Sequence, residues 1–478
     1  MLERIPFLYA YFRAGLLRNS TRWLAPFLIA GLLLFSIALP LLPAQRFVIY
    51  LPVLVAGAFI ALAFIRWPGL GLVALIAASL LVPFAIGTGS ETSINVTIML
   101  LVMLIGLWVL DMVAYRRQIW LVESRTMRPL AFLLAVVVIS FLIGLQPWFP
   151  FARQSASLAA QLGGLFLFFL SVGAFILVAN QIREIRWLEW MTWVFVGLGG
   201  VFIAGWLLPF VGTISSRIFQ YGAIDGGMFW TWLVALAFSQ ALINKKIGRG
   251  WRLVLAAIAG ATLFVGLFMN NGWKSGYIPP VAAVATIIAF RSWRVGLGLA
   301  LVGLAVGSSL VSSTIASDQY SYSTRVEAGV IILDIVKSSP IFGFGPANYY
   351  WYTPLFPIRG YAVEFNSHNQ YIDIIAQIGF LGLAILLWFF VELGLLAVRL
   401  RNQVQEGFEQ AYVYGVIGGL VGTLVAGVIA DWFIPFVYNV GYRGFRASVL
   451  AWIFMGGLVS LEAITRRRGQ SQQTAIGN

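Results

Sequence analysis

The only histidine in the sequence, His368, is the first candidate for chemistry, because the 478 residues include no cysteine. These two counts exclude disulfides, Cys or His zinc clusters, iron–sulfur centres and cysteine nucleophiles. We expect no cofactor. An imidazole titrates near neutral pH and often serves as a general base. A purely structural histidine is the alternative interpretation.

The residues around His368 favour the catalytic interpretation. Asn366 or Ser367 is a good helix N-cap, which predicts that His368 lies in the first turn of a helix. The positive end of the helix dipole disfavours imidazolium, so we expect a neutral ring that can accept a proton near pH 7. The side chains near enough in sequence to orient this ring are those of Asn369, Tyr371 and Asp373.

Two arginines are candidates for holding an anion. Arg325, in SYSTRVEAGVIILDIVKSSP, is followed by apolar residues at roughly helical spacing, namely Val326, Val330, Ile331 and Val336. This pattern predicts an amphipathic helix with Arg325 in its first turn, where a cation opposes the helix dipole and a bound anion would explain its presence. Arg217, in SSRIFQYGAIDGG, is expected at the centre of a polar, glycine-rich loop.

The composition indicates which class of protein positions these residues. Hydrophobic residues make up 60% of the chain and charged residues 10%, against about 25% charged residues in ordinary globular proteins. A bilayer core needs roughly 20 apolar residues per helix. Fourteen such stretches are centred near residues 33, 55, 77, 104, 137, 168, 200, 236, 262, 284, 304, 385, 421 and 455. The sequence therefore predicts an all-α polytopic membrane protein with about 12–14 transmembrane helices in a single transmembrane domain, residues 1–478.

One connection between the predicted spans is much longer than the others. It covers residues 313–373, between the predicted eleventh and twelfth spans, and contains both Arg325 and His368. Long connections in compact proteins usually carry function or are disordered. Residues 465–478 are polar and predict a disordered cytoplasmic tail.

The distribution of basic residues predicts the orientation in the membrane. With the N-terminus in the cytoplasm, 22 of the 31 Lys and Arg residues fall on the cytoplasmic side, as the positive-inside rule requires. The nine on the other side are Arg46, Arg153, Arg217, Lys274, Arg325, Lys337, Arg359, Arg443 and Arg446. We therefore expect both termini inside and the long connection on the extracytoplasmic side, where each remaining cation needs water or an anionic partner.

An aromatic run lies in the long connection, after a tight turn predicted at Gly343, Gly345 and Pro346. It consists of Tyr349, Tyr350, Trp351, Tyr352 and Phe356. These side chains could lie in the headgroup belt, which is the commoner place for Trp and Tyr in membrane proteins, or form a platform on which sugars stack. The candidates for binding substrate are Asn369, Tyr371, Arg359, Lys274 and Tyr349.

The region around His368 resembles the signature region of the O-antigen ligase and polysaccharide polymerase superfamily, which are bacterial membrane glycosyltransferases. The resemblance covers about residues 210 to 395. It has an Arg-led amphipathic helix, a P-x-x-G-x-G turn, an H-N-x-Y helix start and a G-x-x-G in the next span. These are Arg325, then Pro340, Gly343 and Gly345, then His368, Asn369 and Tyr371, then Gly379 and Gly382.

The resemblance implies a GT-C-type fold and transfer of a glycan from undecaprenyl pyrophosphate to an acceptor hydroxyl outside the bacterial cytoplasmic membrane. The family's histidine maps onto His368, its loop arginine onto Arg325, and an earlier arginine onto Arg217. Two features depart from the family pattern. GAIDGGMFW follows Arg217 where many relatives have an Asn-Pro-Asn-like stretch, and two more N-terminal spans are predicted than the usual twelve. The acceptor, whether a sugar, a lipid or a protein, is therefore left open.

The residues themselves agree with this chemistry. Arginine is always charged and binds phosphate through two N–H groups, so Arg325 and Arg217 could hold the pyrophosphate while His368 accepts the proton of the attacking hydroxyl. The acidic residues outside occur singly, at Glu91, Asp225, Asp318 and Glu364. We therefore expect a metal-independent, inverting displacement, with Asp225 as the reserve base.

Other functions stay open on the sequence alone. A polymerase of the same superfamily, which joins repeat units, would use the same residues as a ligase. A transporter or flippase of a lipid-linked glycan would place ionisable residues deep in its spans and often shows internal repeats. Asp111, Glu392 and Asp431 lie near the ends of predicted spans instead, and no repeat is visible. The expected partners are the lipid-linked donor, its acceptor and membrane lipids, with no nucleic acid.

Overall fold

The computed structural model describes residues 57, 60–87, 93–152, 155–220, 222–298, 301 and 319–476. Outside these residues lie most of the predicted spans centred near 33, 55 and 304, the start of the 313–373 connection, and Arg46, Glu91, Arg153 and Asp318. The chain divides into two compact units, Met1–Trp67 with Gly106–Trp120, and Pro68–Ile105 with Leu121–Asn478. The candidate site lies in the second unit, and a single transmembrane domain over residues 1–478 stays a prediction.

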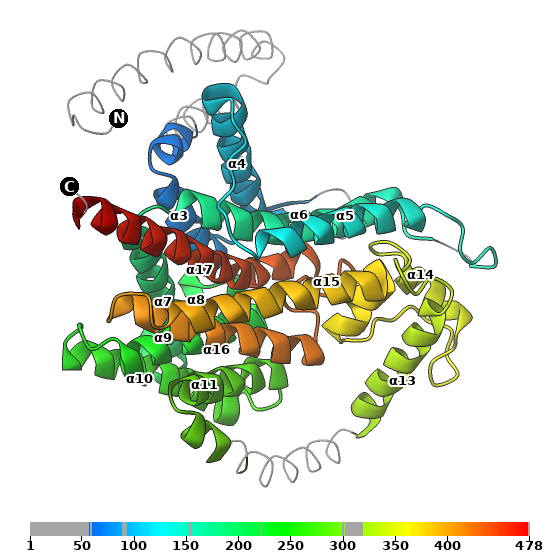
Figure 1. The fold of residues 1–478 in the computed structure, drawn as a ribbon. Coiled ribbons are helices and arrows are strands. Elements are labelled where there is room, and N and C mark those ends of the chain that lie inside the picture. The colour runs from blue at the N-terminus through cyan, green and yellow to red at the C-terminus, as the bar shows by residue number, and fades with distance from the viewer. Residues whose placement is uncertain are drawn as a thin grey trace, which may run out of the picture. The chain divides into compact units, whose positions relative to one another are not determined.

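Helices make up most of the described chain, as predicted (Figure 1). The α-helices are α3 (Pro68–Leu81), α4 (Val96–Leu110), α5 (Met127–Gly144), α6 (Leu158–Gln181), α7 (Ile185–Leu207), α8 (Pro209–Ile218), α9 (Gly227–Ile243), α10 (Arg249–Phe264), α11 (Ile278–Arg291), α13 (Gln319–Val336), α14 (Tyr349–Tyr352), α15 (Gln370–Leu400), α16 (Phe408–Ile429) and α17 (Gly441–Ile476). Between them lie the 3₁₀ helices η3 (Ala223–Asp225), η5 (Lys274–Gly276) and η6 (Thr353–Leu355), and the π-helical turns η2 (Asp111–Arg116) and η4 (Val265–Met269). A small antiparallel ribbon, β1 (Ala85–Gly87) and β2 (Ser93–Asn95), pairs Ala85 with Asn95.

Eight helices of the described residues are long and apolar enough to cross a membrane. They are Val96–Ala114, Met127–Gly144, Leu158–Gln181, Ile185–Leu207, Arg249–Met269, Gln370–Leu400, Phe408–Ile429 and Gly441–Ser471. Helices α3 and α9 are apolar but shorter, and α11 coincides with the predicted stretch near residue 284. An all-α polytopic membrane protein is therefore confirmed, whereas the higher number of spans and the GT-C-type fold stay predictions.

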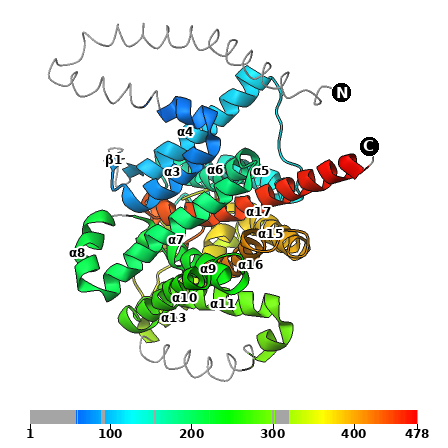
Figure 2. The ribbon, with the colours of Figure 1, turned by 90° about the vertical axis from the view of Figure 1, so that its left-hand side faces the viewer.

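Helix α9 lies at the centre of the second unit, against α10, α11, α16 and α17 (Figure 2). Almost all of its residues are buried. A helix surrounded on every side needs no polar face, which explains its mostly apolar sequence. Its Trp232 donates the indole N–H to the Thr423 hydroxyl of α16 at 3.2 Å.

The long helix α15 is interrupted at Gly379, which has φ 72° and ψ 178°. An interruption within a span leaves backbone groups that must find other partners inside the protein. The turn at residues 340–345 supplies them. The N–H of Phe380 donates to the Pro340 carbonyl, and the N–H groups of Phe344 and Gly345 donate to the carbonyls of Ala376 and Gln377, each at 2.9 Å. Positive φ angles at Gly343 and Gly345 confirm the predicted tight turn.

Three local predictions are wrong. Helix α17 continues to Ile476, so the tail is helical rather than disordered, as its Arg, Gln and Ala residues favour. Arg217 lies in the last turn of α8, which begins with a proline at its first position, and not in a loop. Helix α13 begins at Gln319, so Arg325 lies in its second turn and the argument from the helix dipole does not apply.

Candidate active site

His368 occupies a tight loop immediately before α15. Its φ is +50°, in the left-handed region that residues other than glycine rarely adopt. The N-cap of α15 is Asn369, whose side-chain oxygen accepts a hydrogen bond from the backbone N–H of Tyr371 at 3.0 Å. The N-cap predicted at Asn366 or Ser367 is therefore wrong, and His368 precedes the helix instead of lying in its first turn.

Three candidate side chains converge on the C-terminal end of α16. Arg325 Nη1 donates to the Ile429 carbonyl at 3.4 Å, Asn369 Nδ2 to the Val428 carbonyl at 3.2 Å, and the Tyr371 hydroxyl to the Leu424 carbonyl at 2.6 Å. Val428 and Ile429 are among the last four residues of α16, whose carbonyls lack helical partners and readily accept such donors, whereas Leu424 lies one turn earlier. The end of α16 thus holds together residues of α13 and α15 that the sequence placed in one site. A direct role of Asn369 and Tyr371 in binding substrate stays a prediction.

The surroundings of His368 keep its ring neutral. The side chain is half-buried, and burial is the main cause that lowers the pKa of the imidazole below its usual 6.5. The positive charge of Arg325 lowers this pKa further. The predicted neutral ring therefore follows from burial and from Arg325, and not from the dipole of α15. At neutral pH the ring can accept a proton.

Asn439, in the loop between α16 and α17, contacts the ring of His368. Its Nδ2 lies 3.5 Å from His368 Nδ1 and donates to Asp431 Oδ1 at 2.5 Å. Asp431 is fully buried, and its Oδ2 accepts the backbone N–H of Phe436 at 2.7 Å. The sequence carries no signal for this arrangement, because Asn439 is separated from His368 by 71 positions along the chain.

A second buried carboxylate, Asp373, supports the same loop. Its Oδ1 accepts hydrogen bonds from the hydroxyls of Tyr349 at 2.5 Å and Ser367 at 2.8 Å. Tyr349 is itself fully buried, so its ring offers no surface to a substrate. Tyr349 thus links α14 to α15 and the His368 loop, and its expected role in binding substrate stays a prediction.

The aromatic run Tyr349–Tyr352 packs largely inward. Tyr350 stacks on Tyr438 with ring centroids 4.7 Å apart, and the indole N–H of Trp351 donates to the Tyr438 hydroxyl at 2.7 Å. Tyr438 directly precedes Asn439 in the chain. The run therefore supports the loop that contacts His368, while a place in the headgroup belt or a sugar platform stays a prediction for its partly exposed rings.

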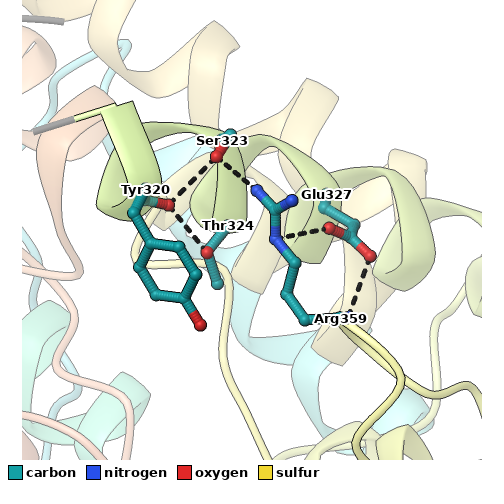
Figure 3. A network of polar contacts seen from close by, with 5 residues as sticks. All are labelled: Tyr320, Ser323, Thr324, Glu327 and Arg359. Carbon is teal, nitrogen blue, oxygen red and sulfur yellow. Dashed lines mark hydrogen bonds and ion pairs between the residues drawn. The ribbon is translucent and has the colours of Figure 1, made fainter. Parts of the chain in front are cut away.

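Arg359 lies in a turn that contacts α13 (Figure 3). Its Nε is 3.0 Å from Glu327 Oε2, and its backbone N–H donates to Glu327 Oε1 at 3.1 Å. Its guanidinium also contacts the Ser323 hydroxyl and lies over the ring of Tyr320, 5.6 Å from the centroid. Through these contacts Arg359 holds the helix that carries Arg325, and its expected contact with substrate stays a prediction.

The remaining candidates lie apart from His368. Arg217 is exposed, Lys274 is half-buried in η5, and no hydrogen bond or ion pair within the described ranges joins either of them to Arg325. Asp225, at the end of η3, is exposed, and partial desolvation raises the pKa of its carboxyl although two arginines of α17 oppose this effect. The part of the chain that the structure describes holds no group of three or more His, Asp or Glu side chains suited to a metal ion.

A family model described as O-antigen ligase matches residues 225–387. The resemblance to the O-antigen ligase and polysaccharide polymerase superfamily is confirmed. No curated protein matches the chain. The O-antigen ligase match contains Arg325 and His368, whereas Arg217 precedes it and Asp431 and Asn439 follow it. The family match thus covers the candidate base and one candidate arginine, and the structure alone identifies the loop that contacts the base.

Proposed function

We propose that this enzyme of the O-antigen ligase and polymerase superfamily transfers a glycan from undecaprenyl pyrophosphate to an acceptor hydroxyl. The reaction would take place at the outer face of the bacterial cytoplasmic membrane, with both termini of the enzyme in the cytoplasm. The observation that carries the proposal is a neutral His368 beside Arg325 within the matched residues. Arg325 is exposed and makes one long hydrogen bond among the described residues, at 3.4 Å, so its other N–H groups can face an anion.

In the proposed reaction Arg325 binds the pyrophosphate and stabilises the charge that develops on it as it leaves. His368 accepts the proton of the acceptor hydroxyl while that oxygen bonds to the anomeric carbon and the bond from this carbon to the pyrophosphate oxygen breaks. Attack opposite the leaving group inverts the anomeric configuration. A positioned base typically contributes ~10²–10⁴-fold to such a step. No metal takes part, Arg217 is the second candidate for the pyrophosphate, and Asp225 is the reserve base.

A polymerase of the same superfamily is the alternative, because joining one repeat unit to another needs the same base and the same arginine. The two functions differ in what a cell accumulates when the gene is deleted. Loss of a ligase leaves long lipid-linked glycan that is not delivered, whereas loss of a polymerase leaves single repeat units. Chain length of the accumulated lipid-linked glycan therefore separates them.

The proposal is tested by reconstituting the enzyme in vesicles with a lipid-linked glycan donor and following transfer. Arg325→Lys and Arg217→Lys should reduce transfer although charge is kept, because the lysine ammonium lacks the planar fork of two parallel N–H groups with which arginine binds phosphate. Arg186→Lys is the matched control, since Arg186 is an exposed residue that pairs with Glu184. Transfer should persist in excess chelator. Full activity of both variants would mean that the pyrophosphate binds elsewhere, and loss of activity in chelator would require a metal.

A further inference from the structure

The side chain of Asn439 lies between His368 and Asp431. Its Nδ2 faces both His368 Nδ1, at 3.5 Å, and Asp431 Oδ1, at 2.5 Å. An amide nitrogen is only a donor, so in this arrangement Nδ1 is the acceptor of the pair. A neutral imidazole carries one proton, which must then be on Nε2. His368 therefore presents a donor at Nε2 in the state that the structure shows.

Both oxygens of Asp431 accept hydrogen bonds, an arrangement that suits the ionised form of this carboxyl group. Oδ1 accepts from Asn439, and Oδ2 accepts from the backbone N–H of Phe436 at 2.7 Å. Burial raises the pKa of Asp431, while these two hydrogen bonds oppose that effect. The other titratable or charged side chains that face Asp431 and His368 are Asp373 of α15, Tyr349 of α14 and Arg325 of α13.

We propose that Asp431, acting through the amide of Asn439, sets which ring nitrogen of His368 carries the proton. With Asp431 ionised, Asn439 donates to Nδ1 and the proton is on Nε2. When Asp431 takes a proton from water, the side-chain amide of Asn439 flips, so that its Oδ1 replaces Nδ2. The hydroxyl of Asp431 then donates to Asn439 Oδ1. The same oxygen then accepts Nδ1–H, and the ring releases its Nε2 proton to water and takes one at Nδ1. Asp431 and Asn439 are thus positioning residues of His368.

The catalytic consequence of this arrangement rests on the proposed function. Because Nδ1 faces Asn439, Nε2 is the nitrogen left to receive the proton of an acceptor hydroxyl, and it must be bare to do so. The base-competent state would therefore be the one in which Asp431 holds a proton. The assignment of the proton in the free enzyme does not depend on the reaction.

The single histidine makes this inference directly measurable. In full-length protein labelled with ¹⁵N-histidine, purified with an affinity tag that lacks histidine and embedded in lipid bilayers, NMR at neutral pH observes only the imidazole of His368. The wild type should show a protonated Nε2 and a bare Nδ1. In Asp431→Asn, the new amide oxygen takes the place that accepts the Phe436 N–H, and its NH₂ group takes the place of Oδ1. This change should flip the side-chain amide of Asn439, so that its oxygen faces His368, and move the ring proton to Nδ1.

Two further variants complete the experiment. Asn439→Ala removes the contact at an exposed position and, once its unfolding temperature shows that the variant is folded, should give both tautomers in comparable amounts. Asp334→Asn, at an exposed carboxylate of α13 that pairs with Lys337, is the control and should keep the wild-type spectrum.

A proton on Nδ1 in the wild type, or a wild-type spectrum in folded Asp431→Asn or in Asn439→Ala, would overturn the inference. The proposed function is tested separately, by the transfer assay. Full activity of His368→Ala would disprove the proposed function and leave the tautomer result unaffected.

Discussion

Arg325 acts on His368 through its charge as well as through the anion that we propose it binds. The guanidinium and burial both lower the pKa of the imidazole, and a base with a lowered pKa stays neutral at mildly acidic pH. Residues of these types, in a long connection, could be recognised from the sequence. Asn439 and Asp431 could not, because only the packing of the α16–α17 loop against the His368 loop brings them into the site.

A change of Arg325 should therefore alter the pH dependence of transfer. Activity that needs a neutral imidazole falls as the pH drops through the pKa of His368, and in the wild type this fall should lie below the usual 6.5. Arg325→Gln removes the charge and leaves burial, so the pKa rises and the fall should move to higher pH. The measurement is kcat/KM against pH, with Lys337→Gln, at the residue directly after the same helix, as control. An acidic limb that does not move in Arg325→Gln would contradict this account.

At the scale of elements, the site depends on contacts that tie α13 and α15 to segments far from them in the chain. The sequence predicted α13 as a helix and the tight turn at residues 340–345. It could not show that this turn supplies the backbone hydrogen bonds of the interrupted α15, or that the Arg359 turn contacts α13. Such contacts depend on which distant segments pack together in the folded protein, and residue spacing in the sequence does not predict this.

The contact of Arg359 with Glu327 predicts a rescue by charge reversal. Arg359→Glu should place two like charges together, loosen α13 and lower transfer, by up to about 10²-fold if Arg325 is displaced by an ångström. Because the pair is partly exposed, with 34% and 36% of the two side chains accessible, stability should change by less than about 1 kcal/mol. The double variant Arg359→Glu with Glu327→Arg should recover much of the activity in the vesicle assay. Absence of any recovery would mean that Arg359 acts on substrate after all.

The interruption of α15 predicts that Gly379 is intolerant of substitution. A Cβ at this position would lie 1.9 Å from the Ile341 carbonyl oxygen, and the φ of +72° is itself unfavourable for alanine. Gly379→Ala should therefore destabilise the protein by about 3 kcal/mol or more, seen as a lower unfolding temperature in detergent. Gly260→Ala is the control, because a Cβ there meets nothing within 4 Å. Equal unfolding temperatures for the two variants would contradict the tight approach of the 340–345 turn.

At the scale of the whole molecule, composition alone was enough to predict a helical membrane protein, because apolar stretches of span length leave few alternatives. The sequence could not distinguish α9, a short helix buried among its neighbours, from a helix that faces lipid, since both are mostly apolar. The orientation in the membrane follows from the distribution of basic residues and not from the coordinates.

This orientation can be measured without background labelling, because the chain has no cysteine. Tyr361→Cys, at an exposed position of the Arg359 turn, should react with a membrane-impermeant maleimide applied to intact cells from which the outer membrane has been removed. Gln403→Cys, in the exposed connection between α15 and α16, should react only after the membrane is opened. The reverse pattern would place the candidate site on the cytoplasmic side and exclude the proposed function.

The central claim is that His368 is the base of a glycan transfer, and the rate of the His368→Ala variant tests it most directly. Purified wild type and variant are reconstituted in vesicles with the same lipid-linked donor and acceptor. Equal unfolding temperatures of the two proteins show that the variant is folded. We predict a loss of ~10²–10⁴-fold in the rate of transfer, with donor binding retained because Arg325 is untouched. Transfer by His368→Ala at the wild-type rate would contradict the account.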